Sequence, residues 1–164
     1  MPQELLDAWV VAAQRAAAAR GVVGVVDLEM AENRDVWLRR IAAGADRLRV
    51  DFGIYTQHLP RAIAEGLRSG AIIPGSQGLL TVGFFKVLID GSLNTRTAYC
   101  FDEFPGLEGQ PHGRGLLTVQ PEDLDDLLRT VVAAGITPTV HAIGDQANRI
   151  ALDSFERVGA TGRI

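Results

Sequence analysis

Residues 121–141 read PEDLDDLLRTVVAAGITPTVH and contain a helix, a glycine and a strand in close succession. The stretch opens with a proline and places Glu122 and Asp123 in the first turn, and both features favour a helix N-terminus. Gly135 stands where helices commonly end in a left-handed residue. The apolar run 136–141 then predicts a buried strand. This succession is typical of an α/β fold.

The same unit of helix, glycine and strand recurs along the chain. Its apolar strands alternate with helices, which implies a parallel sheet covered by helices. Two architectures fit, a doubly wound sheet and part of a (β/α)8 barrel, and a complete barrel takes about 250 residues. The predicted helices are 4–19, 35–43, 59–68, 121–134 and 145–158, and the predicted strands are 22–28, 48–54, 79–89 and 136–141.

Composition excludes several classes of protein. Of the 164 residues, 47% are hydrophobic and 22% charged, as in ordinary globular domains. The net charge of −4 and the lack of a basic run argue against nucleic acid as a partner. No apolar stretch approaches the roughly 18 residues that a membrane span needs, and the N-terminus has no signal-peptide pattern. The single cysteine, Cys100, rules out an internal disulfide and favours a cytoplasmic location.

A long irregular connection, 91–119, follows the third strand. Loops beyond about 12–15 residues in a compact domain are usually functional or disordered. This one leaves the carboxyl edge of the predicted sheet, where parallel α/β folds place their active sites. Ser92, Thr95 and Arg96 lie in it and are candidates for holding an anionic or polar substrate.

Lys86 interrupts the apolar third strand, in Gly-Phe-Phe-Lys-Val-Leu-Ile-Asp-Gly. A buried ammonium is costly unless it is paired or neutralised. Under a structural interpretation, Lys86 extends to the strand end or pairs with an acid such as Asp90. Under a functional one, it is a Schiff-base nucleophile, a phosphate anchor or a carbamylated metal bridge. The pattern alone leaves both open.

His141 closes the fourth strand and is either a hydrogen-bonded core residue or a metal ligand. Consecutive strands of right-handed βαβ units are usually neighbours, so Lys86 and His141 are expected to reach one site. Asp145 is expected to cap the last helix or to orient His141. Asp90 is expected to begin a turn or to line the site. Weaker candidates are Asp27, which ends the first strand, the solvated His58 and His112, and the packed Cys100.

Two stretches resemble signatures of the amidohydrolase superfamily. Residues 85–98, FKVLIDGSLNTRTA, and residues 140–145, VHAIGD, are similar to motifs of amidohydrolase family 3, which includes enzymes like N-substituted formamide deformylase and proteins named as exoenzyme regulators. The resemblance implies a metal-binding (β/α)8 barrel, of which residues 1–164 form a single segment covering about strands 2 to 5. It also implies that Lys86, carbamylated in many members, and His141 bind metal.

The cofactor implied by this resemblance is a divalent metal, expected to be zinc, with one or two ions in the full-length enzyme. A lysine carbamate can bridge two such ions, which activate water for hydrolysis of amide-type C–N bonds other than peptide bonds. Other ligands of the family are missing, because the chain has no His-x-His pair, no sixth-strand histidine and no eighth-strand aspartate. Asn94 also replaces a glycine that is common in the motif.

The chain is therefore expected to be a fragment of a metal-dependent hydrolase that is inactive alone and binds metal weakly or not at all, and whose substrate is a small amide-type molecule. The alternative is a non-catalytic half-barrel that acts as a binding, regulatory or assembly module and forms homo-oligomers through exposed strand edges. A flavodoxin-like fold is a third interpretation, but it needs a phosphate-binding first loop that residues 21–29 do not supply.

Overall fold

The computed structural model describes residues 2–164, which form two compact units. The first comprises the residues up to Phe84, and the second runs from Phe85 to Ile164. The boundary falls within strand β3 (Leu80–Leu88), so each unit contains part of this strand. Hydrogen bonds connect β1 to β2, β2 to β3 and β3 to β4.

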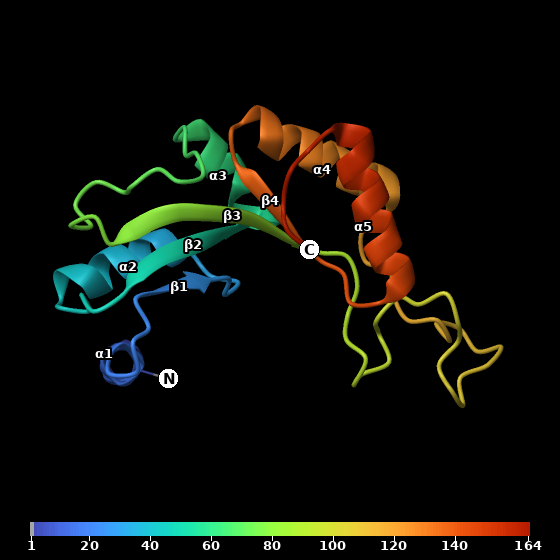
Figure 1. Ribbon diagram of the computed structural model, residues 1–164, viewed down its shortest axis with the longest axis horizontal. Helices are drawn as coiled ribbons and strands as arrows, with labels where there is room; N and C mark the ends of the chain where they lie inside the picture. The colour runs from blue at the N-terminus through green and yellow to red at the C-terminus, as the bar shows by residue number, and fades with distance from the viewer. Residues whose placement is uncertain (1) are drawn as a thin grey trace. The chain divides into compact units, whose positions relative to one another are not determined.

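The first unit alternates helices with strands from its N-terminus onward (Figure 1). Its elements are α1 (Gln3–Ala18), β1 (Gly24–Asp27), α2 (Asn33–Ala42), β2 (Arg49–Tyr55), the 3-10 turn η1 (Thr56–His58) and α3 (Leu59–Ala64), followed by the first part of β3. Strands β1 and β2 are parallel, with Gly24 opposite Arg49 and Asp27 opposite Phe52. The backbone N–H of Val50 donates to the carbonyl of Leu79 at 2.7 Å and joins β2 to the chain entering β3.

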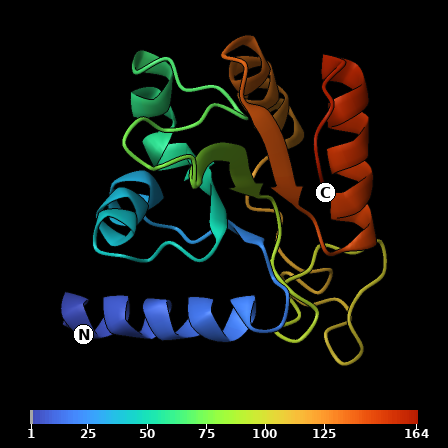
Figure 2. The same cartoon turned by 60° about the vertical axis from the view of Figure 1, so that its left-hand side comes forward.

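Apolar side chains of α2 and β2 form the core of the first unit, with Trp37, Ile41, Phe52 and Ile54 all buried. Helix α1 lies near α2 in both ribbon views (Figures 1 and 2), and the Asp7 carboxylate accepts a hydrogen bond from Arg40 Nε at 2.9 Å. Strand β1 ends the order of strands, and within residues 2–164 it pairs only with β2, so its other edge is unpaired in that part of the chain.

The second unit contains the rest of β3, α4 (Pro121–Ala133), β4 (Thr137–His141) and α5 (Asp145–Val158). Helices α4 and α5 pack together, and the Asp125 carboxylate receives two hydrogen bonds from Arg157, at 2.8 and 2.9 Å. The core consists of fully buried apolar residues, namely Phe85, Ile89, Leu124, Leu128, Val131, Val140, Ala147 and Ala151. After α5, Arg163 forms a parallel bridge with Thr139, so a further stretch of extended chain begins beside β4.

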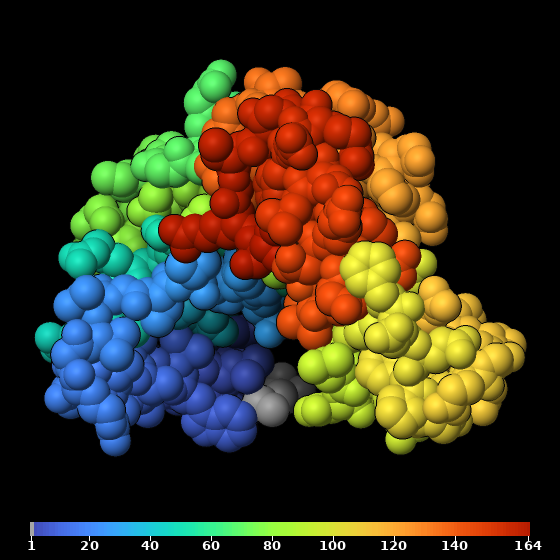
Figure 3. All heavy atoms as spheres, turned by 45° about the vertical axis from the view of Figure 1, so that its right-hand side comes forward, coloured from blue at the N-terminus to red at the C-terminus, as the bar shows by residue number. Residues whose placement is uncertain are grey.

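The long connection after β3 contains neither helix nor strand over residues 89–120, as the sequence predicts. Figure 3 shows it in yellow as a lobe beside the orange and red atoms of the same unit. The loop returns to the strand that it leaves, because the N–H of Thr118 donates to the carbonyl of Ile89 at 2.8 Å. The loop is thereby anchored at the carboxyl end of β3.

The predicted fold class is confirmed. Four parallel strands alternate with helices as in part of a (β/α)8 barrel. The main difference from the sequence prediction is the third helix, predicted over 59–68, which ends at Ala64. Gly66 follows with a φ of 68°, a left-handed conformation that stops a helix. Among residues 2–164, no helix combines the length and the apolar character needed to cross a bilayer.

Candidate functional site

Lys86 lies on the face of β3 that is turned away from the core of the second unit. The neighbouring residues Phe85 and Val87 are buried, whereas Phe84, Lys86 and Leu88 alternate with them and stay partly accessible. The Lys86 ammonium has no hydrogen bond or ion pair with any residue of 2–164, and burial lowers its pKa. The predicted alternative of an ion pair with Asp90 is therefore wrong.

Lys86 is also the only lysine in the chain, since every other one of the 16 basic Lys and Arg residues is an arginine. Arginine remains charged at all ordinary pH values, whereas a lysine amine can lose its proton and react. The chain's one lysine, which can act as a neutral amine, thus lies in an apolar strand and has no anionic partner among residues 2–164. This compositional signal was available from the sequence.

The register of β3 and β4 brings Lys86 and His141 to the same face. The N–H of Ile89 donates to the carbonyl of His141 at 3.1 Å. In a parallel ladder this bond places Leu88 opposite His141, and Lys86 precedes Leu88 by two residues, so both side chains point the same way. Standard strand spacing then separates the two Cα atoms by about 8 Å, within reach of a lysine side chain.

The imidazole of His141 is held by the backbone that follows β3. Nε2 lies 2.8 Å from the carbonyl oxygen of Gly91, and because a carbonyl can only accept, Nε2 carries the proton. In the neutral ring, Nδ1 is then left with a free lone pair. Metal-binding histidines are commonly arranged in this way, with one nitrogen donating to a carbonyl and the other facing the metal.

Asp90 is the most completely buried acid near this face, with a side chain that is 0% exposed. Its two oxygens accept hydrogen bonds from the backbone N–H groups of Tyr99, Ile143 and Gly144 at 2.7–3.0 Å. Its Oδ1 also lies 3.7 Å from Nε2 of His141. Sequence reasoning identified Asp90 as a candidate but not this role in joining two loops.

Asp145 is the first residue of α5, and the N-cap is Gly144, so the expected cap at Asp145 is displaced by one residue. The Asp145 carboxylate accepts hydrogen bonds from the N–H groups of Phe101 and Gln146, both at 2.9 Å. It therefore ties the long loop to the start of α5. No hydrogen bond joins Asp145 to His141 in the described chain.

The loop after β3 carries the remaining candidates. The hydroxyl groups of Ser92, Thr95 and Thr97 form a chain, with oxygens 2.9 and 2.6 Å apart. Arg96 is exposed and left-handed, with a φ of 56°, and its guanidinium has no ion pair among residues 2–164. Asn94, which replaces the motif's glycine, is not among the positive-φ residues, so its backbone needs no glycine.

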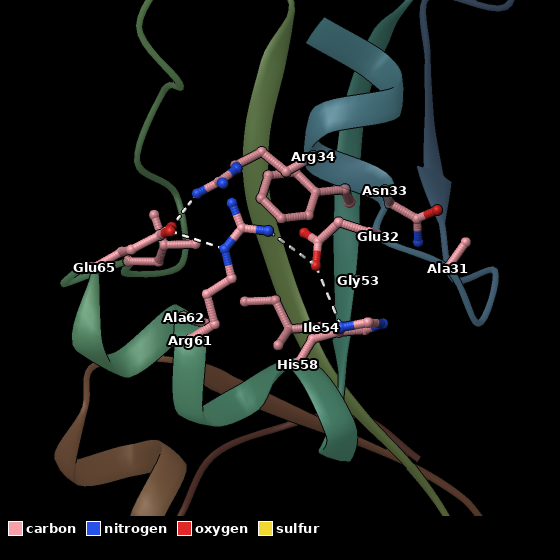
Figure 4. A pocket seen from close by; sticks show the side chains of 12 residues that line it. Ala31, Glu32, Asn33, Arg34, Gly53, Ile54, His58, Arg61, Ala62 and Glu65 are labelled. Carbon is pink, nitrogen blue, oxygen red and sulfur yellow. Dashed lines mark hydrogen bonds and ion pairs between the residues drawn. The ribbon is translucent and has the colours of Figure 1, made fainter.

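The first unit contains a different charged cluster, shown in Figure 4. His58 Nδ1 lies 3.2 Å from Glu32, Arg61 pairs with Glu32, Asp35 and Glu65, and Arg34 pairs with Asp35 and Glu65. These side chains lie around a pocket between α2 and α3, and each of the three acids pairs with at least one arginine. The cluster therefore supports the packing of the helices.

The weaker candidates are mostly structural. Asp27 accepts hydrogen bonds from the Trp37 indole at 2.6 Å and from the N–H of Glu29 at 3.0 Å. His112 is exposed in the long loop, as expected, and burial raises the pKa of Cys100. Within residues 2–164, no three His, Cys, Asp or Glu side chains gather as a metal site.

Two solved structures share the fold over the whole chain. They are described as uncharacterized metal-dependent hydrolases, from Pyrococcus furiosus, with a TM-score of 0.83 and 23% identity, and from Pyrococcus horikoshii OT3, with a TM-score of 0.82 and 25% identity. The chain covers 34% and 32% of these proteins. The first of these similarities shows the fold alone.

A curated relative is the Protein LONG AFTER FAR-RED 3 of Arabidopsis thaliana, which is 28% identical over 159 residues. This match takes in 90% of the chain but 26% of the relative, so the chain spans about a quarter to a third of the proteins that it matches. The model of the amidohydrolase family matches residues 2–163. The chain therefore belongs to the amidohydrolase family.

Proposed function

We propose that the second unit supplies two metal ligands, Lys86 and His141, to a hydrolase that cleaves amide-type C–N bonds other than peptide bonds. The observation that carries this proposal is that, within residues 2–164, a lysine with no ion pair and a histidine with no hydrogen bond at Nδ1 lie on one face of neighbouring strands. Family membership and the metal-dependent hydrolases of the same fold support it.

The chemistry of Lys86 suits this role once the amine is neutral. The lone pair of the neutral amine attacks the carbon of carbon dioxide, so a C–N bond forms and one C=O electron pair moves onto oxygen. The nitrogen then loses one of its protons to solvent. The product is a carbamate anion with two oxygens, which are suitable ligands for divalent cations. Burial lowers the pKa of Lys86 and so favours the neutral amine that this reaction requires.

Lys86 and His141 would hold a divalent metal, for which we propose zinc, and that metal would supply Lewis-acid chemistry toward water and the scissile carbonyl. His141 contributes a ring that is already oriented by Gly91. Further ligands and a general base are expected from parts of a longer protein, since two donors cannot complete a zinc site. The single cysteine is in keeping with a reducing, cytoplasmic setting.

A second candidate is a non-catalytic assembly module, favoured by the open edge of β1. Val25 and Val26 of this strand are 38% and 45% exposed, and the preceding Val23 is 64% exposed. An apolar edge strand is a template for pairing with another chain. The name of the Arabidopsis relative refers to far-red light and not to hydrolysis, which is compatible with this candidate.

The metal proposal predicts weak binding that depends on His141. Calorimetric titration of the purified chain with Zn²⁺ is expected to show low affinity, which His141→Ala reduces by about 10-fold or more. The matched control is His112→Ala, which changes an exposed loop histidine and should leave the affinity unchanged. Equal affinities for wild type and His141→Ala would contradict the proposal, as would amide hydrolysis by the isolated chain.

The functional interpretation of Lys86 predicts that its charge does not stabilise the fold. Lys86→Met keeps an apolar stem and removes an ammonium without an anionic partner, so the free energy of unfolding should rise or stay within about 1 kcal/mol of wild type. Arg157→Met, which breaks the ion pair with Asp125, is the contrasting control and should lower stability. Urea denaturation measures both. A larger loss for Lys86→Met than for Arg157→Met would favour a structural lysine.

The assembly candidate predicts a concentration-dependent dimer formed through β1. Light scattering after size exclusion should show a dimer for wild type and a monomer for Val26→Lys, because lysine on an edge strand opposes pairing. Val132→Lys, at an exposed position of α4, is the control and should remain dimeric. A wild-type monomer at all concentrations would remove the assembly candidate.

A further inference from the structure

We infer that Asp90 is the positioning residue of the candidate metal centre. Its buried carboxylate joins the loop after β3 to the turn after β4, and this junction fixes the direction in which His141 presents Nδ1. The inference rests on the proposed function only where it names a metal as the group that Nδ1 meets. The claim that Asp90 orients the imidazole ring of His141 rests only on hydrogen bonds within the second unit.

The first step is the number and direction of the hydrogen bonds at the carboxylate. Oδ2 accepts from the N–H of Tyr99 at 2.9 Å and from that of Gly144 at 2.7 Å, while Oδ1 accepts from Ile143 at 3.0 Å. Tyr99 belongs to the long loop, and the other two residues belong to the turn between β4 and α5. A single side chain therefore joins three backbone groups from two loops.

The second step is the charge of this side chain. No lysine or arginine of residues 2–164 pairs with Asp90, and its side chain is fully buried. Peptide N–H groups stabilise the anion instead, as in backbone sites that bind anions. Each of these three bonds involves a charged acceptor and is stronger than a bond between neutral groups.

The third step is how closely the joined segments approach. A Cβ built on Gly144 would lie 2.0 Å from the carbonyl oxygen of Tyr99, and one built on Gly91 would lie 1.9 Å from Oγ1 of Thr97. A side chain at position 144 would push the turn after β4 away from the long loop, and one at position 91 would displace Thr97 within that loop. The N–H of Ala147 donates to the carbonyl of Tyr99 at 3.0 Å and adds a second link there. The junction is thus tightly packed around Asp90.

The fourth step leads to the imidazole ring. Gly91 directly follows Asp90, so the position of the carboxylate also sets the direction of the Gly91 carbonyl, which receives Nε2–H of His141 at 2.8 Å. Oδ1 of Asp90 lies 3.7 Å from the same nitrogen and attracts its proton. Without the carboxylate, both groups that face Nε2 change, and Nδ1 is no longer held in one direction.

Asp90→Asn is the most specific variant, because it keeps the size of the side chain and replaces one of its two acceptor oxygens with an NH₂ group. All three backbone partners are donors, and an asparagine side chain offers one acceptor oxygen and one NH₂ group. In either orientation of the amide, at least one backbone N–H faces the NH₂ group and loses its partner. The matched control is Asp145→Asn, which weakens a different tie between the long loop and α5 without touching His141.

The experiment is nitrogen-15 NMR of the histidine rings, supported by titration with Co²⁺. The chain has three histidines, so the His141 signal can be assigned with His141→Gln. Wild type and Asp145→Asn should show a His141 Nε2–H signal protected from exchange with water, and Asp90→Asn should lose it. Asp90→Asn should also bind Co²⁺ about 10–100-fold more weakly.

A retained Nε2–H signal in Asp90→Asn, or its loss in Asp145→Asn as well, would overturn the inference. Amide exchange of the wild-type chain tests the same junction in case Asp90→Asn does not fold. The N–H groups of Tyr99 and Gly144 should exchange slowly although both residues lie outside helices and strands, and rapid exchange would overturn the inference. Failure of the metal proposal is separate, since it appears as unchanged metal affinity in His141→Ala.

Discussion

The organisation of the second unit depends on one buried carboxylate, that of Asp90, at the point where β3 ends. Its hydrogen-bond donors are peptide N–H groups, so its buried oxygens keep their partners only while the turn after β4 and the loop after β3 stay in place. The burial of the Asp90 carboxylate is thereby linked to the orientation of the His141 ring. The same junction that satisfies the charge also directs the Gly91 carbonyl at His141.

Lys86 shows the opposite condition, because its partly buried amine has no hydrogen bond or ion pair with any residue of 2–164. In most folded proteins such a lysine would be replaced or paired, because desolvation of an ammonium is costly. Here every other basic Lys or Arg position is an arginine, and the one lysine lies on the face shared with His141. A chemical use of the amine gives a reason for keeping it there.

Part of this could be predicted from the sequence. The helix, glycine and apolar strand around Gly135 form a local pattern, so this pattern predicted a parallel α/β class. The resemblance of the stretches 85–98 and 140–145 to family motifs selected Lys86 and His141 as candidates. The triple hydrogen bond of Asp90 could not be predicted, because its donors Tyr99 and Gly144 are brought together only by folding. Helix α3 ends early because Gly66 adopts a left-handed φ. Residues 59–68 are mostly helix formers, so their composition predicted a longer helix.

The central claim is that His141 offers Nδ1 to a divalent metal while Nε2 remains bonded to Gly91. The most direct measurement is a titration of the ¹⁵N-histidine-labelled chain with Zn²⁺, in which both ring nitrogens of His141 are followed by NMR. The account predicts that the Nδ1 signal shifts on binding while the Nε2–H signal persists. A shift at Nε2, or shifts confined to His58 and His112, would contradict it.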